Sequence, residues 1–124
     1  MPTPRWFGLL SLLLIGAARV EAAGRVVITE VHYHPPASQG ELFEFVEIRN
    51  VSGASLSLSG WRLAGGIEFR FPDSATLAPG AYGLVCHDAH IFGNAYSAAQ
   101  PRILGSYSGY LDDGGDTLDL LDGS

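Results

Sequence analysis

Short runs in which apolar and polar residues alternate follow one another from residue 25 onwards, and they predict β-strands. The longer runs cover residues 25–34, 42–50, 56–63, 67–71, 82–87 and 117–122. A short extended piece is expected at 103–104, and a loop or an edge strand at 106–113. Gly60 predicts a bend within its run, and Gly65-Gly66 is typical of a hairpin. In Leu77-Ala78-Pro79-Gly80, Pro sets φ and Gly supplies a positive φ, which predicts a turn. One helical turn is expected within residues 88–96, with Asp88 as its N-cap and its end at Gly93 and Asn94.

The first two runs have apolar residues on both faces. Strict alternation in residues 25–34 separates two sets, Val27, Thr29, Val31 and Tyr33 on one face and Ile28, Glu30, His32 and His34 on the other. In residues 42–50, Glu44, Val46 and Ile48 alternate with Phe45, Glu47 and Arg49. A strand that is apolar on both faces is either central in its sheet or bulged, and both possibilities are open for residues 42–50.

The spacing of the runs predicts an all-β fold. About seven short strands at spacings of roughly 8–12 residues, with almost no helix, are typical of a β-sandwich. The 16 Gly and 7 Pro residues support this, because they favour a turn-rich β architecture over a helical bundle. The residues expected to pack between the sheets are apolar or aromatic: Val27, Val31, Phe45, Val46, Ile48, Leu58, Trp61, Phe69, Phe71, Tyr82, Leu84 and Leu118.

The first segment of the chain has the layout of a secretory signal peptide. Arg5 is followed by thirteen residues without a charge, and Ala22 and Ala23 then provide small residues at a cleavage site. A transmembrane helix needs about 20 apolar residues, so the run is too short for one. We therefore expect a signal-peptide helix at residues 1–23 and a single domain at residues 24–124, with no membrane span after cleavage. The alternatives are an uncleaved anchor and a buried helix.

Charge narrows the possible partners. The 124 residues carry 7 basic and 13 acidic side chains, a net charge of −6, and there is no Lys. Cleavage after residue 23 would leave five Arg and twelve acidic residues, a net charge of −7. This balance argues against a nucleic-acid partner, which requires a basic surface, and leaves cations as the favoured charged partners. The single cysteine, Cys86, excludes a framework of internal disulfides and is expected to be a buried apolar residue; an intermolecular disulfide is the alternative.

Three blocks in fixed order resemble a known family. They are F-V-E-I-R-N at 45–50, L-S-G-W-R-L at 58–63 and L-A-P-G at 77–80, and together they are similar to the lamin tail domain in its bacterial secreted form. The resemblance covers residues 24–124 and implies an immunoglobulin-like β-sandwich with no established catalytic site. Family members usually continue past the strand expected at 117–122, so we expect this domain to lack its last strand or strands, as a fragment of a longer protein would.

The resemblance favours a non-catalytic, secreted or cell-surface module that contacts a protein, the cell envelope or a glycan. Its expected partners are an unknown protein or surface glycan and downstream domains of the same polypeptide, and no cofactor is expected. The expected location is secreted, periplasmic or cell-surface. One alternative is an accessory N-terminal domain of a longer secreted enzyme, such as a hydrolase, a nuclease or a spore-coat kinase-like protein. Another is a metal-dependent binding module.

Two groups of residues are candidates for metal binding. His32 and His34 point to the same side of a strand and could share one ion, with a third ligand from elsewhere, such as His87, Asp88 or His90. The acidic residues near the C-terminus could bind calcium, although their spacing does not match an EF-hand loop. Those acidic residues are Asp112, Asp113 and Asp116, with Asp119 and Asp122 further on. We favour a structural explanation for both groups. The two histidines would then lie at a solvated strand end, and the acidic residues on the solvent face of a hairpin.

Two further sets of side chains could carry function. Glu30, Glu44 and Glu47 lie on two strands expected to be neighbours, and a carboxylate pair can perform acid–base catalysis. A structural role is favoured, because nothing in the sequence places the three in a cleft. Among the aromatic residues, Tyr107 and Tyr110 are the better candidates for an exposed binding surface, since Trp61 and the Phe residues are expected in the core. No residue is assigned a catalytic role.

Overall fold

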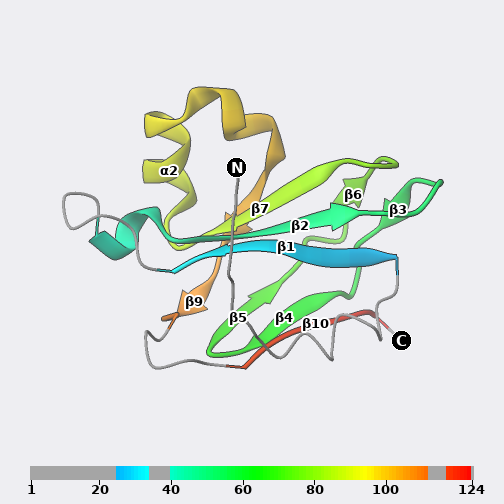
Figure 1. The fold of residues 1–124 in the computed structure, drawn as a ribbon, viewed down its shortest axis with the longest axis horizontal. Coiled ribbons are helices and arrows are strands. Elements are labelled where there is room, and N and C mark those ends of the chain that lie inside the picture. The colour runs from blue at the N-terminus through cyan, green and yellow to red at the C-terminus, as the bar shows by residue number, and fades with distance from the viewer. Residues whose placement is uncertain (1–24, 34–39, 112–116, 124) are drawn as a thin grey trace.

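The computed structural model describes residues 25–33, 40–111 and 117–123. Over these residues the chain forms two four-stranded sheets that face each other, which confirms the predicted all-β sandwich (Figure 1). The first sheet has the order β1-β2-β7-β8 and is antiparallel except between β7 and β8. Its strands are β1 (Val26–His32), β2 (Phe45–Asn50), β7 (Tyr82–Cys86) and β8 (Ile103–Ser106).

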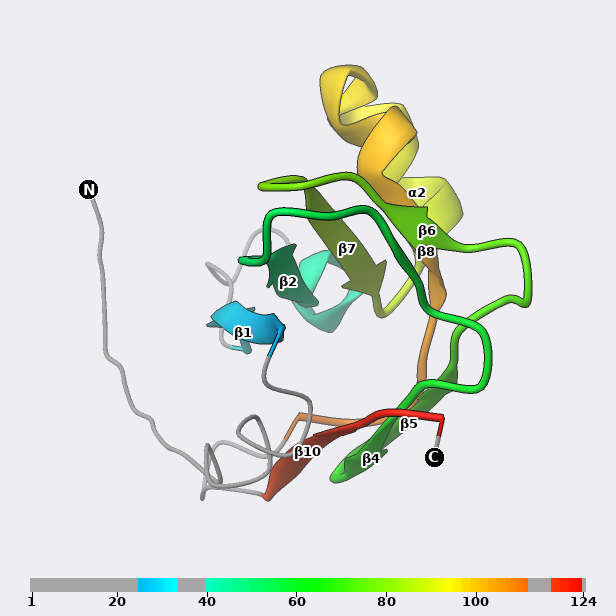
Figure 2. The same cartoon turned by 90° about the vertical axis from the view of Figure 1, so that its right-hand side faces the viewer.

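The second sheet is antiparallel and has the order β10-β4-β5-β9. Figure 2 shows its strands β10, β4 and β5 on the opposite side of the sandwich from β1, β2 and β7. Its strands are β4 (Arg62–Gly65), β5 (Ile67–Arg70), β9 (Ser108–Gly109) and β10 (Leu118–Leu121). A short pair, β3 (Leu56–Ser57) and β6 (Thr76–Leu77), joins the two sheets at one end. The helical segments are η2 (Gly40–Phe43), α2 (Ala89–Ala95) and η3 (Ser97–Arg102).

Strand β1 departs from the strict alternation predicted for residues 25–34. Its register shifts between Ile28 and Glu30, where Thr29 is the extra residue of a β-bulge. An extra residue exchanges the two faces for the rest of the strand, so Ile28 and Val31 both pack on the core. Val27 does not belong to the core, and the prediction that it shares a face with Val31 is wrong.

The other predicted strands are confirmed with shorter bounds, except that the piece at 103–104 extends to residue 106 as β8. The run at 42–50 begins inside η2, and its strand β2 lies between β1 and β7, so the central placement is correct. The run at 56–63 is divided at Gly60, which has φ +82°, while the Trp61 N–H donates to the Leu58 carbonyl at 2.9 Å. The turn at 77–80 is also confirmed, because Gly80 has φ +76° and the Ala81 N–H donates to the Ala78 carbonyl at 3.0 Å.

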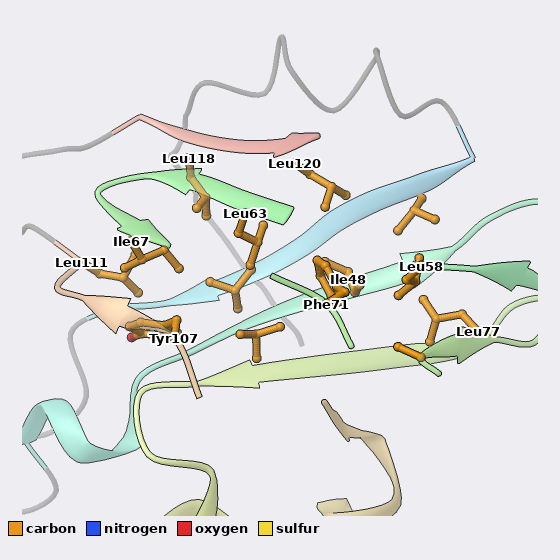
Figure 3. Packing of buried hydrophobic residues seen from close by; sticks show 14 residues of the cluster. Ile48, Leu58, Leu63, Ile67, Phe71, Leu77, Tyr107, Leu111, Leu118 and Leu120 are labelled. Atoms are coloured by element: carbon orange, nitrogen blue, oxygen red, sulfur yellow. The ribbon is translucent and has the colours of Figure 1, made fainter. Parts of the chain in front are cut away.

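The main core fills the space between the two sheets (Figure 3). Of the predicted core residues, Val46, Ile48, Leu58, Phe71 and Leu118 are buried in it, and Val31, Trp61 and Phe69 pack against it. Burying each large apolar side chain contributes about 1.5–3 kcal/mol, so this cluster is the main source of stability. The sequence prediction omitted several of its members: Val26, Leu63, Ile67, Leu77, Tyr107, Leu111 and Leu120.

A second, smaller core lies on the outer face of the first sheet, under α2. Its buried residues are Leu84, Cys86, Phe92 and Ala99, and Phe45 packs against them. Phe45 and Leu84 were predicted to pack between the sheets, and that prediction is wrong, because successive strand residues point to opposite faces and α2 covers the outer one. Tyr82 belongs to neither cluster.

Several predictions concern residues outside the described part of the chain. These are the signal-peptide helix at residues 1–23, the metal candidate His34, and the Asp112, Asp113 and Asp116 group. The described residues contain no helix long and apolar enough to cross a membrane.

Candidate functional site

Aromatic side chains gather at one end of the sandwich, where β1 and β7 finish and β2 begins. We call this region the aromatic end, and it lies on the left of Figure 1, around η2, the start of α2 and β9. Its members come from separate parts of the chain and share ring contacts with one another. They are His32, Phe43, Phe45, His87, Phe92, Tyr96, Tyr107 and Tyr110.

One row of rings runs from β1 to α2. The His32 ring stacks on Phe45 with centroids 5.1 Å apart and planes 19° from parallel. Phe45 meets Phe92 edge-on at 5.4 Å, and Phe92 contacts Tyr96 at 5.0 Å. Tyr96 in turn meets Phe43 of η2 edge-on at 6.1 Å. Such pairs add about 0.5–1.5 kcal/mol each beyond their buried area, so the row fixes α2 and η2 to the sheet.

Local sequence explains why α2 starts where it does. Asp88 follows β7 with extended backbone, and its carboxylate accepts a hydrogen bond from the Ile91 N–H at 2.9 Å. This is the predicted N-cap, and it satisfies one of the N–H groups that a helix leaves free at its start. The helix then extends to Ala95, past the end predicted at Gly93 and Asn94, and it brings Phe92 over Phe45.

A second group of aromatic residues lies where the chain crosses from one sheet to the other. Tyr107 stands between β8 and β9, and its N–H donates to the Cys86 carbonyl at 2.9 Å. Its hydroxyl donates to Oε1 of buried Glu44 at 3.0 Å. The His87 ring meets Tyr107 edge-on at 5.7 Å and lies 5.9 Å from the ring of Tyr110. The prediction that Tyr107 is a surface residue is wrong, since only 5% of it is exposed.

Four large apolar side chains at or beside the aromatic end are exposed to solvent. Tyr110 is 63% exposed, Tyr96 44%, and Tyr33 and Leu42 both 41%. The only other large apolar residue exposed to this degree, among the described residues, is Val51 at the opposite end. The predicted exposure of Tyr110 is therefore confirmed. Tyr33, which the sequence also allowed as part of an aromatic surface, is exposed as well. Tyr96 and Leu42 were missed, because their exposure depends on how α2 and η2 pack.

The opposite end is built from turns, and we call it the turn end. There Asn50, which is fully buried, ties three segments together with its side-chain amide. Its Nδ2 donates to the Ala54 carbonyl at 2.8 Å and to the Leu77 carbonyl at 2.9 Å. Its Oδ1 accepts from the Ser52 N–H at 2.9 Å and from the Ser52 hydroxyl at 2.7 Å. The block F-V-E-I-R-N thus ends in a residue that uses its whole hydrogen-bonding capacity.

The fold and these local motifs agree with one family, because a sequence model of the Lamin Tail Domain matches residues 19–124. The chain belongs to the lamin tail domain family. Lamin tail domains are immunoglobulin-like and non-catalytic, so the resemblance seen in the sequence is confirmed. A search of curated proteins finds no match to the chain.

The three glutamates proposed as an acid–base group do not meet at one site in this lamin tail domain. Glu47 lies directly across from Glu30 in the register of β1 and β2, and its Oε1 accepts from the Thr29 hydroxyl at 2.9 Å. Glu44 points to the opposite face, where Tyr107 binds it. The alternation along the start of β2 therefore separates Glu44 from the other two.

The histidines of the lamin tail domain are held mostly by aromatic neighbours. Partial burial at the end of β1 lowers the pKa of His32 below its ordinary value of 6.5, because the charged imidazole loses hydration there. His87 has a buried Nδ1 with no hydrogen-bond partner, and His90 is exposed and lies 3.2 Å from the Asn94 amide. Among the described residues, no three His, Cys, Asp or Glu side chains are grouped closely enough to hold a metal ion.

Cys86 lies beneath α2 and is completely buried. Burial raises the pKa of its thiol to about 12, with a further contribution from the negative charge of Asp88. The thiolate is the reactive form of cysteine, so the folded domain keeps Cys86 inert. The expected role as a small apolar core residue is confirmed by its place in the second core.

Proposed function

We propose that this lamin tail domain is a non-catalytic interaction module, exported to the cell surface or beyond, that binds its partner through the aromatic end. The observation that carries the proposal is the exposure of Tyr110, Tyr96, Tyr33 and Leu42 in one region. Tyrosine is enriched in the centres of binding interfaces because it combines a large apolar ring with a polar hydroxyl and few rotatable bonds.

The rigidity of this region supports the same role. Tyr96 rests on Phe92 and Phe43, and Tyr110 rests on His87, so both exposed rings have packed support. A supported ring loses little conformational entropy when a partner covers it. The aromatic end therefore has the character of a preformed binding surface.

Co-sedimentation with isolated cell envelopes of the producing organism tests the binding role. We expect the exported protein to sediment with envelopes, and the double variant Tyr96→Ser, Tyr110→Ser to remain in the supernatant. Val51→Ser removes an equally exposed apolar residue at the turn end and should behave as wild type. Absence of the wild-type protein from the envelope pellet would argue against the proposal, as would equal sedimentation of the double variant.

Export is tested separately by mass spectrometry of the protein outside the cytoplasm. Cleavage after Ala22 or Ala23 should give a mature chain that begins at Ala23 or Gly24, respectively. An extracellular protein that retains Met1 would contradict cleavage, and its absence from all exported fractions would contradict export.

A further inference from the structure

Charge is unevenly distributed between the two ends of the sandwich. Four of the five arginines after residue 24 lie toward the turn end. Arg25 precedes β1, Arg49 is next to last in β2, and Arg62 and Arg70 pair across β4 and β5 at the end remote from their hairpin. Arg102, which ends η3, is the exception.

Carboxylates lie at both ends, because Asp73 accepts a hydrogen bond from Ser59 and Asp122 follows Leu121, the partner of Arg62, toward the turn end. Two others are part of the aromatic end, where few arginines accompany them. Glu44 lies between Phe43 and Phe45 and binds Tyr107, and Asp88 follows His87 and caps α2. The negative field of Asp88 is felt by its neighbour, since it contributes to the raised pKa of the Cys86 thiol. A partner that approaches the exposed tyrosines therefore meets few arginines, with Asp88 half-buried and Glu44 buried at the same end.

The turn end shows how an arginine and a tyrosine fit together on this sheet. The Arg49 guanidinium carbon lies 4.9 Å from the ring centroid of Tyr82, while its Nε donates to the Gly80 carbonyl at 3.2 Å. Cations are attracted to the face of an aromatic ring, and more strongly when a carboxylate is near. Tyr96 and Tyr110 present the same ring type, and 44% and 63% of these residues are exposed to solvent.

We propose that the aromatic end binds a basic, extended protein segment whose Arg or Lys side chains lie over Tyr96 and Tyr110. This inference rests on the proposed function and names the partner class for the same surface. Charge complementarity selects a basic segment: the domain is acidic and has no Lys, and its own arginines lie mostly at the other end. Electrostatic attraction of this kind speeds encounter and orients the partner.

The first test uses hexa-arginine as the probe, with hexaglutamate and chitohexaose for comparison, and the isotopically labelled mature protein. We expect hexa-arginine to shift the amide resonances of Tyr96, Tyr110 and their neighbours, and hexaglutamate and chitohexaose to leave them unchanged. Affinity should fall steeply when NaCl is raised, because salt screens charges at a distance of about 10 Å at 0.1 M. Shifts confined to residues 112–122, or shifts at the aromatic end with chitohexaose instead of hexa-arginine, would overturn the proposal.

The second test separates site binding from attraction by net charge. Tyr96→Ser, Tyr110→Ser leaves the net charge unchanged, so loss of the two rings should weaken hexa-arginine binding about tenfold, whereas Val51→Ser should not weaken it. Equal affinity of the double variant and wild type, with both folded by their amide spectra, would show that net charge alone binds the probe and would refute the site. In analytical ultracentrifugation without a probe, the wild-type protein should sediment as a monomer. If it self-associates, and Tyr96→Ser, Tyr110→Ser abolishes that association, the partner of this surface is a second copy of the chain and the basic segment is wrong.

The two proposals fail in different ways. If the exported protein binds envelopes through Tyr96 and Tyr110 but hexa-arginine does not bind, the interaction module stands and the basic partner is wrong. If the envelopes do not bind the protein at all, the proposed function itself is wrong.

Discussion

The two ends of the sandwich are held together by different physical means. At the turn end, one buried amide, Asn50, connects three backbone segments through directional hydrogen bonds. At the aromatic end, rings from β1, β2, α2 and η2 pack on one another, and a buried side-chain hydrogen bond joins Tyr107 to Glu44. The turn end leaves one large apolar residue exposed, Val51, whereas the aromatic end leaves four.

This difference separates stability from binding. At the turn end, the amide of Asn50 is fully hydrogen-bonded within the domain, so it has no donor or acceptor left for a partner. Stacked rings are attractive on both faces, and the outermost ring of a row still has a face for a partner. The aromatic end can therefore contribute to stability through its buried rings and to partner binding through its exposed rings.

The largest effect is expected from Phe92→Ala. Phe92 is 6% exposed and contacts both Phe45 and Tyr96, so its removal opens a cavity between α2 and the sheet. We expect unfolding by urea to show a loss of about 4 kcal/mol in the free energy of unfolding. Val51→Ala, an exposed apolar residue at the other end, should change it by less than about 0.5 kcal/mol. A loss below about 1 kcal/mol for Phe92→Ala would mean that α2 is not fixed by the row of rings.

Asn50→Ala tests the turn end. The substitution leaves the buried carbonyl of Leu77 without its amide donor and frees the turn that Ser52 closes on Oδ1. Each buried polar group left unsatisfied costs about 1–3 kcal/mol, so we expect the free energy of unfolding to fall by about 3 kcal/mol. Ser52→Ala removes only the hydrogen bonds of the Ser52 hydroxyl, to Asn50 Oδ1 and the Ala54 carbonyl, and should cost about 1 kcal/mol. Equal losses for the two variants would show that Asn50 does not hold the turns.

Much of the fold could be predicted because local signals agree with it. Asp88 is an N-cap residue at the start of α2, Gly65-Gly66 joins β4 to β5, and Pro79-Gly80 sits in the turn that its residue types favour. In each case the physical cause lies within about four residues of sequence, so the pattern carries the information.

The missed features depend on contacts between distant segments. Thr29 and Glu30 are both exposed, so no apolar residue marked the bulge between them. Tyr107 stands between two serines and looked like a surface residue, but the crossing from β8 to β9 carries it over Cys86 and onto Glu44. The aromatic end as a whole joins residues 32 to 110, and nothing in their local sequence indicates that they meet.

A smaller loss is expected when the buried hydrogen bond of the aromatic end is removed. Tyr107→Phe keeps the ring against His87 but takes the hydroxyl donor from Glu44 Oε1. A hydrogen bond contributes about 0.5–1.5 kcal/mol to stability, and Glu44 keeps its other interactions, so we expect the free energy of unfolding to fall by about 1.5 kcal/mol. Ser108→Ala, a neighbour whose hydroxyl is exposed, is the control. If Tyr107→Phe were neutral, the ring contacts alone would hold the chain crossing.

The smallest effect concerns His32 and appears only as the pH is lowered. Because burial lowers its pKa in the folded state, the unfolded chain takes up the proton first as pH falls below 6.5. Stability is therefore complete above pH 6.5 and decreases as the pH falls through the lowered pKa. His32→Phe keeps an aromatic ring over Phe45 without a titrating group, so urea unfolding at pH 7.5 and pH 5.5 should show a smaller acid loss for the variant than for wild type. If both proteins lost the same free energy of unfolding between pH 7.5 and pH 5.5, protonated His32 would have to stay hydrated on the surface. The His32 ring, at the start of the aromatic row, would then be able to turn outward toward a partner.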